Sequence, residues 1–333
     1  MTKKNKTLFG IYTEAIGLYF SNFKQFTKYM TFPVLGQVLG MIIILACTFV
    51  YSKNLPNLIE KYSAFNDFNM LVLFSVIISL PGMIIFIKAF WEYLVAYGAV
   101  NSMLENMLKS GKVYDFKAHT ELIKRRTPSF VTLWLILGIF SLLASFPLLW
   151  VPAGVIAIYL ALVFQVFTYE PDLSPANCIK KSFNLIKGHF GATFLLMFLS
   201  GLLCWVLIPQ IFNYLFETAG ISKMLTRAVV PFIDTMPINE VNIYLAKFGI
   251  SNLVNESLAK LVVTTSIAQI FIQYTLPLRS ILCGLWYKEL NGSLPQQVEK
   301  KKSSKKRPSE KLMEESHKKL DKNILKRAMN KGD

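Results

Sequence analysis

The stretch from Ser129 to Tyr169 contains 41 consecutive residues without a charged side chain. The hydrocarbon core of a bilayer is about 30 Å thick, and an α-helix needs about 20 mostly apolar residues to cross it. The stretch is therefore too long for one membrane span and about right for two. We expect the turn between these two spans at Pro147 and Pro152, because proline interrupts helices.

Four further segments are long and apolar enough to cross a bilayer. The six predicted spans cover residues 31–51, 70–91, 129–149, 151–169, 190–209 and 261–286. The mean hydropathy of +0.42 and the charged fraction of 17% agree with this, since soluble domains carry about 25% charged residues. The composition excludes a soluble enzyme, a disordered chain and a disulfide-rich secreted domain. The predicted fold class is all-α, a polytopic membrane bundle of about six transmembrane helices with cytoplasmic interfacial amphipathic helices.

The basic residues between the spans predict the orientation. Of the lysines and arginines, 28 lie in segments expected on one side of the membrane, and five lie in the two segments expected on the other. Basic loops stay on the cytoplasmic side, which predicts that both termini are cytoplasmic. The five occur in residues 52–69 and 217–258; the second segment either lies outside the membrane or re-enters it.

The same pattern divides the chain into three parts. Residues 1–30 form an N-terminal cytoplasmic segment with an interfacial helix, residues 31–289 form the six-span membrane domain, and residues 290–333 form a disordered basic tail. The localisation that follows is a cytoplasmic (inner) membrane, with the chain crossing it several times.

Three amphipathic segments each come directly before a span. Residues 10–30 place aromatic side chains on one helical face and Lys24 and Lys28 on another. In residues 174–190, Ser174 is a good N-cap and Pro175 a good first helical residue. Residues 116–130 form a weaker third copy. Helices of this kind lie in the headgroup plane, which favours three hairpins, each entered through an interfacial helix. Any helix beside a bilayer becomes amphipathic, so the similarity is also explained without a repeat.

Two motifs carry a family resemblance. LSPANCIKKSFNLIKG at residues 173–188 and LWYKEL at residues 285–290 resemble bacterial six-span integral-membrane families of unassigned role. These families are related to the membrane domain that precedes some bacterial glycerophosphodiester phosphodiesterases. Lys288 departs from their pattern, which usually has an acidic residue at that place. The resemblance covers about residues 8–290 and implies a fold in a bacterial membrane; the phosphodiesterase's catalytic barrel has no counterpart here.

Polar residues within the spans are the candidate intramembrane sites, because such groups are costly in lipid unless they are paired. Lys88 and Glu92 lie four residues apart on one helical face and can pair; a structural ion pair, a snorkelling lysine and an ion-coupling site are the alternatives. Gln269 and Gln273 stack in the last predicted span, with Arg279 beyond them. Interhelical hydrogen bonds or a path for a polar substrate explain these glutamines.

One small-residue motif and several prolines also lie within the spans. Gly36 and Gly40 form a GxxxG motif, which suits close packing of helices. Prolines such as Pro81 and Pro277 interrupt or end spans. Broken helices occur in transporters, although proline is common in membrane spans generally.

Basic residues outside the spans are the candidate contacts for lipid headgroups. A basic cluster directly after a span attracts anionic lipid, at about 1 kcal/mol for each basic residue; the same charges attract RNA or simply keep the tail solvated. The predicted headgroup contacts are Lys180, Lys181, Lys187, Lys300, Lys301, Lys302, Lys305, Lys306 and Arg307.

The sequence contains no recognisable catalytic, cofactor or metal motif. A lipid-modifying enzyme would require His119, His189 and Asp172 to gather at headgroup depth. We therefore predict a non-enzymatic protein without cofactors that supports membrane organisation or the assembly of other membrane proteins. Its expected partners are anionic lipids and, through the tail, a membrane protein or a ribosome, with no specific nucleic acid. The alternative is a transporter, or a transporter subunit, for a small polar solute or ion. The oligomeric state stays open.

Overall fold

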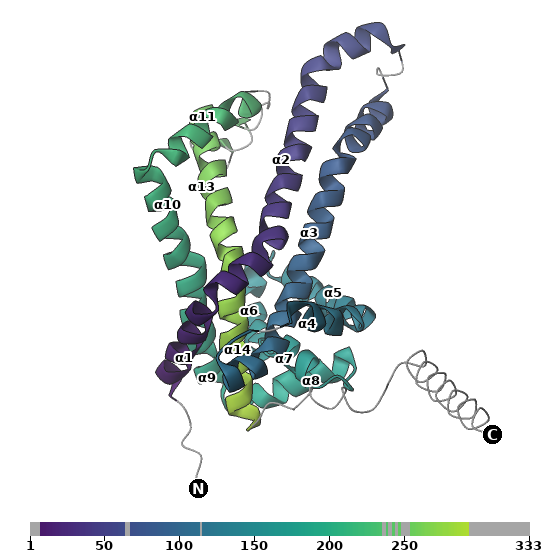
Figure 1. Ribbon diagram of the computed structural model, residues 1–333. Helices are drawn as coiled ribbons and strands as arrows, with labels where there is room; N and C mark the ends of the chain where they lie inside the picture. Colours follow the sequence, from purple (N-terminus) through teal and green to yellow (C-terminus); the bar gives the residue numbers. More distant parts are fainter. Residues whose placement is uncertain are drawn as a thin grey trace, which may run out of the picture. The chain divides into compact units, whose positions relative to one another are not determined.

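A computed structural model describes residues 7–63, 67–113, 115–234, 238, 242–243, 246–247 and 254–292. The elements in this part of the chain are helices, without a strand (Figure 1). They belong to one compact unit, residues 1–293. The predicted basic tail, apart from its first three residues, lies outside the described residues, as do all six of its predicted headgroup contacts.

The longest helices form a hairpin. Helix α2 (Phe23–Lys61) and helix α3 (Phe68–Ser110) run side by side (Figure 1). Their backbones meet at Gly40 and Gly82, where a Cβ on either glycine would lie 2.7 Å from a backbone atom of the other helix. The predicted packing role of the GxxxG motif is confirmed, because Gly36 also faces α3, and a Cβ added there would lie 2.8 Å from the Cβ of Ala89.

Three short helices pack against the longer ones at one end of the bundle. Helix α1 (Leu8–Ser21) contacts the last helix, α4 (Phe116–Lys124) contacts α3, and α8 (Pro175–Ile186) contacts α7 (Val163–Tyr169). We call this end, with its helices α1, α4, α7 and α8, the base (Figure 1). The N-cap of α8 is confirmed, since the Ser174 side chain accepts a hydrogen bond from the backbone N–H of Asn177.

The long uncharged stretch forms two helical segments, but its turn lies earlier than predicted. Helix α5 (Thr127–Leu143) ends before a short turn, followed by η2 (Pro147–Leu149) and α6 (Trp150–Tyr159). Both prolines lie at the beginning of a helical segment rather than in the turn. Proline lacks a backbone N–H, and the first turn of a helix is where that donor is not needed.

The next apolar segment runs past its predicted end at residue 209. Helix α9 (Phe190–Gly201) continues through a π-helical turn, η3 (Leu202–Leu207), into α10 (Ile208–Thr218). Pro209 therefore does not end the helix. The wider π-turn directly before it changes the hydrogen-bond register where proline has no donor to offer.

The last predicted span is a bent pair of helices. Helix α13 (Asn255–Tyr274) leads at Thr275 into α14 (Leu276–Asn291). Helix α11 (Ile221–Ile233) packs against α10 and α13. The bend between α13 and α14 is 41°. Pro277 leaves a backbone carbonyl of the preceding turn without its helical donor, which accounts for the break.

Four described helical segments are long and apolar enough to cross a membrane, and the bent pair is a fifth. Helix α5 is the shorter apolar helix at the place of the third predicted span. One predicted helix was wrong in its extent, because the N-terminal helix breaks at Asn22 and residues 23–30 belong to α2. Helix α3 continues to Ser110, beyond the expected end of the second span near residue 91. These apolar helices indicate a multi-pass membrane protein.

Candidate functional site at the base

Asn22 joins the first two helices to the loop after α3. Its side-chain amide donates hydrogen bonds to the carbonyls of Leu18 and Gly111, at 2.9 and 3.1 Å. Its Oδ1 accepts one from the backbone N–H of Val113 at 2.9 Å. The residue is fully buried, so these bonds satisfy polar groups that would otherwise be costly. The break between α1 and α2 is thereby fixed to the segment that leads into α4.

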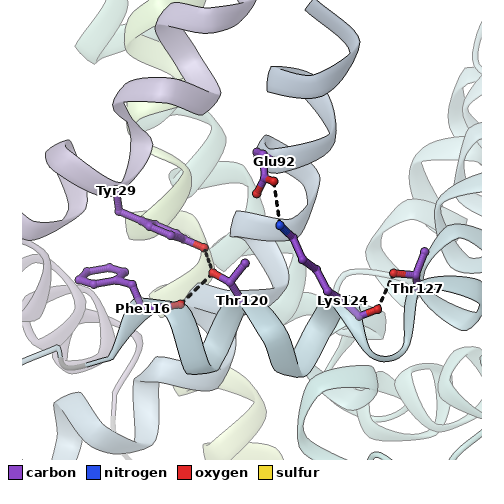
Figure 2. A network of polar contacts seen from close by, with 6 residues as sticks. All are labelled: Tyr29, Glu92, Phe116, Thr120, Lys124 and Thr127. Atoms are coloured by element: carbon purple, nitrogen blue, oxygen red, sulfur yellow. Dashed lines mark hydrogen bonds and ion pairs between the residues drawn. The ribbon is translucent and has the colours of Figure 1, made fainter. Parts of the chain in front are cut away.

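Glu92 pairs with a lysine of another helix. Its carboxylate lies 2.8 Å from the Nζ of Lys124 in α4, as Figure 2 shows. The predicted pairing with Lys88 was wrong: Lys88 is exposed, and its Nζ lies 5.8 Å from the centre of the Phe32 ring. The four-residue spacing brings Lys88 near Glu92 along α3, but the packing of α4 on α3 brings Lys124 closer to the Glu92 carboxylate.

Helix α4 is held by further contacts around this ion pair. The hydroxyls of Tyr29 and Thr120 are 2.8 Å apart, and Thr120 also donates to the carbonyl of Phe116 (Figure 2). Gly98 of α3 leaves room for Ile123, which is fully buried, since a Cβ at Gly98 would lie 3.0 Å from that side chain. These contacts join α2, α3 and α4.

His119 is buried between α4 and α3. Its Nε2 lies 3.2 Å from the amide nitrogen of Asn106, and its Nδ1 lies 2.7 Å from the hydroxyl of Ser102, which is 2.8 Å from the carbonyl of Ala99. Because the amide nitrogen can only donate, Nε2 accepts, Nδ1–H donates to Ser102, and Ser102 donates to the carbonyl. Burial lowers the pKa of His119, partly opposed by the negative charge of Asp115. The neutral imidazole therefore satisfies every partner.

Arg126 connects α5 to the end of α7. Its guanidinium donates to the carbonyl of Phe167 at 2.5 Å and lies 3.9 Å from the centre of the Phe167 ring. The last carbonyls of a helix have no intrahelical donor, and Arg126 supplies one. The ring adds a cation–π contact, so a single arginine joins the two helices through both its charge and its donors.

Glu170 connects three helices at the base. Its two carboxylate oxygens lie 2.5 and 2.6 Å from the Nζ of Lys181 in α8. The hydroxyl of Tyr287 in α14 donates to the same carboxylate at 2.5 Å. A shallow groove of about 460 Å³ opens beside this pair, lined by Lys180, Asn177 and Asn184 among others. The groove presents amide and ammonium donors, which can bind an anionic headgroup.

A buried cluster of amides and hydroxyls lies where α7 of the base meets α3 and α14. The Oδ1 of Asn101 accepts from Ser280 at 2.6 Å and from Gln165 at 3.2 Å, and the backbone carbonyl of Asn101 accepts from Tyr169 at 2.7 Å. The remaining amide atoms, Asn101 Nδ2 and Gln165 Oε1, are buried without a partner among the described residues. The cluster connects α3, α7 and α14.

The bend after α13 carries two of the predicted intramembrane residues. Gln273 accepts a hydrogen bond from Gln37 of α2 at 3.2 Å, which confirms the interhelical bond expected for such glutamines. Arg279 donates to the hydroxyl of Tyr93 at 3.3 Å and to the carbonyl of Ile272 at 3.2 Å, while its Nε is buried without a partner in the described part of the chain. Arg279 thus satisfies a carbonyl at the bend.

The other predicted residues occupy different places. Gln269 is exposed on α13, and Lys180 and Lys187 are exposed on and after α8, whereas Lys181 is half-buried in its ion pair. Asn22 and Lys124 were not predicted. Their signals in the sequence are weak, because an asparagine between two aromatic runs and a lysine within a basic segment acquire their roles only from the partners that tertiary packing provides.

The residues proposed for a lipid-modifying site are not joined. His119 is buried against Ser102 and Asn106, while His189 and Asp172 are exposed, and no hydrogen bond among the described residues connects the three. The described residues also contain no group of three or more histidine, cysteine, aspartate or glutamate side chains suited to a metal ion. Burial raises the pKa of the Cys178 thiol in α8 to about 11, so this thiol is protonated and packs as a small apolar group.

In comparisons with known proteins, no family model, no curated protein and no solved structure matches the chain.

Proposed function

We propose that the chain is a non-enzymatic, multi-pass protein of a bacterial cytoplasmic membrane that supports membrane organisation or the assembly of other membrane proteins. The arrangement of the base is the observation that carries this proposal. Helices α1, α4 and α8 pack at one end on α14, α3 and α7 respectively, and cations are exposed on or beside them. These cations are Lys24, Lys28, Lys117, Arg125, Lys180 and Lys187.

The position of these helices supports the proposed topology of six spans. Helices α4 and α8 lie at the same end, and the chain between them contains α5 and the apolar segment Pro147–Tyr169. If that segment crosses the membrane once, α5 must cross it as well to return the chain. Helix α5 has 17 residues, a length of about 26 Å at 1.5 Å per residue, which nearly matches the bilayer core.

The base then faces the cytoplasm. Twenty-eight basic residues belong to segments expected on its side of the membrane and five to segments expected on the other, and basic segments remain cytoplasmic. The exposed lysines and the groove beside Glu170 and Lys181 provide donors for anionic headgroups. The resemblance of residues 173–188 and 285–290 to bacterial six-span families supports the same membrane and fold.

A transporter remains the second candidate, and one observation favours it. Arg279 Nε, Asn101 Nδ2 and Gln165 Oε1 are buried polar atoms without partners among the described residues. They lie on helices that surround the bend after α13, and broken helices bind substrates in many transporters. A polar solute or ion that reached these atoms would supply the missing partners.

Lipid retention tests the first proposal. The full-length protein would be extracted in native lipid patches at low and high salt, beside Lys180→Gln/Lys187→Gln and a chain ending at Leu294, and bound lipids and proteins would be identified by mass spectrometry. The matched control is Lys53→Gln/Lys61→Gln, which removes the same charge from the far end of α2. We expect anionic lipid, and any protein partner, to fall in the first double variant and the shortened chain but not in the control.

The opposite results would favour the second candidate. If lipid retention is equal in all four proteins and no protein partner is found, the base is not a recruiting surface. A solute that binds the wild type but not Gln37→Leu/Gln273→Leu, with the variant present at the same abundance, would support transport. Loss of abundance without loss of solute binding per molecule would instead assign these glutamines to stability.

A further inference from the structure

A pocket of about 780 Å³ lies between α10, α11 and the first turns of α13. In Figure 1 α11 lies at the end of these helices away from the base. The pocket lining includes three cations and two carboxylates, together with hydroxyl groups. It shares no residue with the groove at the base or with the polar cluster around Asn101, so neither of those two sites accounts for its charged lining.

The cations of the pocket are not balanced by its carboxylates. Glu217 is paired with Lys260 at 2.9 Å. Glu256 lies in the first turn of α13, where a negative charge stabilises the helix dipole. Lys223 and Arg227 are both exposed and have no ion pair among the described residues. They are four residues apart on α11, a spacing at which like charges repel, and an anion between them would remove that repulsion.

The beginning of α11 offers hydrogen-bond donors to the same pocket. Its N-cap is Gly220, at φ 74°, which has no side chain to cap the first turn. The free N–H groups of a helix N-terminus favour anions. Helix α11 has 13 residues, which is long enough for its N-terminus to attract an anion.

Ser222 is an independent sign of a missing ligand. It lines the pocket and is 4% exposed, and its hydroxyl is buried without a hydrogen-bond partner among the described residues. Native structures rarely leave such a group unsatisfied. An acceptor that reached this hydroxyl from the pocket would satisfy it, and an oxyanion is the acceptor that the two unpaired cations also favour.

We propose that this pocket binds the oxyanion of a phosphate-bearing ligand, with Ser222, the first-turn N–H groups of α11, Lys223 and Arg227 as donors. A phosphate has more acceptor oxygens than a carboxylate. It can therefore accept hydrogen bonds from the hydroxyl, the backbone N–H groups, the ammonium and the guanidinium that line this pocket. Two sources share this chemistry, a lipid headgroup and a soluble phosphate ester. Val254, which is 62% exposed, adds apolar surface to the lining of the pocket. The proposal does not depend on the function proposed for the base.

Ligand-induced stabilisation tests it. The full-length protein would be placed in phosphatidylcholine nanodiscs, and its unfolding temperature measured against inorganic phosphate and glycerol 3-phosphate, with sodium chloride at equal ionic strength as reference. A second set of nanodiscs would contain phosphatidylglycerol. The variants are Ser222→Ala and Lys223→Gln/Arg227→Gln, and Lys53→Gln/Lys61→Gln is the control of equal charge.

We expect phosphate to stabilise the wild type and the control alike. Loss of the two cations should raise the half-saturating concentration by about tenfold or more, and loss of the hydroxyl by about threefold. Stabilisation by the soluble probes identifies a soluble ester as the source, and stabilisation only by phosphatidylglycerol identifies a headgroup. The proposal is overturned if no probe stabilises the wild type, or if Lys223→Gln/Arg227→Gln responds to the probes like the wild type. Ser222→Ala removes a single unbonded hydroxyl, so it keeps the test valid if the double variant does not fold.

Discussion

At the scale of single residues, the fold determines which partner a charged or polar group finds. Glu92 has one lysine four residues before it and another in a helix that follows, and it pairs with the second. The spacing of Lys88 predicts a possible contact within one helix, whereas Lys124 reaches Glu92 only because α4 packs on α3. Glu92 therefore stands out in the sequence as an unusual residue but its partner does not, and Asn22 was missed for the same reason.

Breaking the Glu92–Lys124 pair should destabilise the base. The two side chains are 25% and 35% exposed, so we expect Lys124→Met to lower the free energy of unfolding by about 1–2 kcal/mol, less than for a fully buried pair. Lys88→Met should change it by less than about 0.5 kcal/mol. Denaturant titration in detergent would measure both. An equal loss in the two variants would show that Glu92 does not prefer Lys124.

His119 should make stability depend on pH. Its pKa is lowered in the folded protein by burial, while the unfolded chain has the ordinary value of about 6.5. Below that value the unfolded state binds more protons than the folded state, so stability falls as the pH decreases from about 6.5 towards the folded pKa. We expect the loss of unfolding temperature between pH 7.5 and 5.5 to be smaller in His119→Gln than in the wild type. His189→Gln, which alters an exposed histidine, is the control; if both variants keep the full loss, His119 is not its source.

At the scale of elements, small residues and prolines have clear structural effects, but their effects on boundaries depend on context. Gly36 and Gly40 were correctly predicted to pack closely, because a GxxxG motif leaves a groove for a neighbouring helix whichever helix that is. Pro147 and Pro152 were expected in a turn, yet they begin helices. A proline in the sequence predicts a helix boundary nearby, but it does not determine whether the helix lies before or after the proline.

A side chain at Gly40 should separate α2 from α3. Its Cβ would lie 2.7 Å from the backbone nitrogen of Phe86, and backbone atoms cannot move away as a flexible side chain can. We expect Gly40→Ala to lower the free energy of unfolding by about 1–3 kcal/mol.

A matched substitution should act in the opposite direction. A Cβ at Gly138 in α5 would have nothing within 4 Å, so Gly138→Ala should be neutral or stabilise the helix by up to about 1 kcal/mol. Unfolding of both variants in the same detergent would decide. Similar changes in the two would mean that the α2–α3 contact is not close in the folded protein.

At the scale of the whole molecule, the number and order of apolar segments determined most of what could be predicted. The all-helical membrane class follows from hydropathy and is confirmed. The continuation of α3 beyond residue 91 was not predicted, because a span is recognised as about 20 apolar residues and Glu92, Asn101 and Glu105 interrupt the apolar residues that follow. Pro277 was expected to interrupt or end its span, and the helix bends by 41° at Thr275, two residues before it. The candidate site was predicted only in part, since most of its bonds join residues distant in sequence.

The proposed topology predicts which residues are accessible from each side of the membrane. Cysteines placed at Lys53 and Lys223, in a chain whose own four cysteines are replaced, should react with a membrane-impermeant maleimide in intact cells. Cysteines at Lys117 and Lys187 should react only after permeabilisation, because the proposed topology puts α4 and α8 on the cytoplasmic side. Labelling of Lys187→Cys in intact cells would show that α5 does not cross the membrane.

The continuity of α3 has a mechanical consequence. A helix of 43 residues is about 64 Å long, about twice the bilayer core, and it continues through Pro81. A tilt of about 5° would displace one of its ends by about 5 Å relative to the other. Because α4 is fastened near one end of this helix, thinning or thickening of the surrounding lipid that tilted α2 and α3 would move α4 with them. A change in membrane thickness would then change the position of the base, to which α4 belongs.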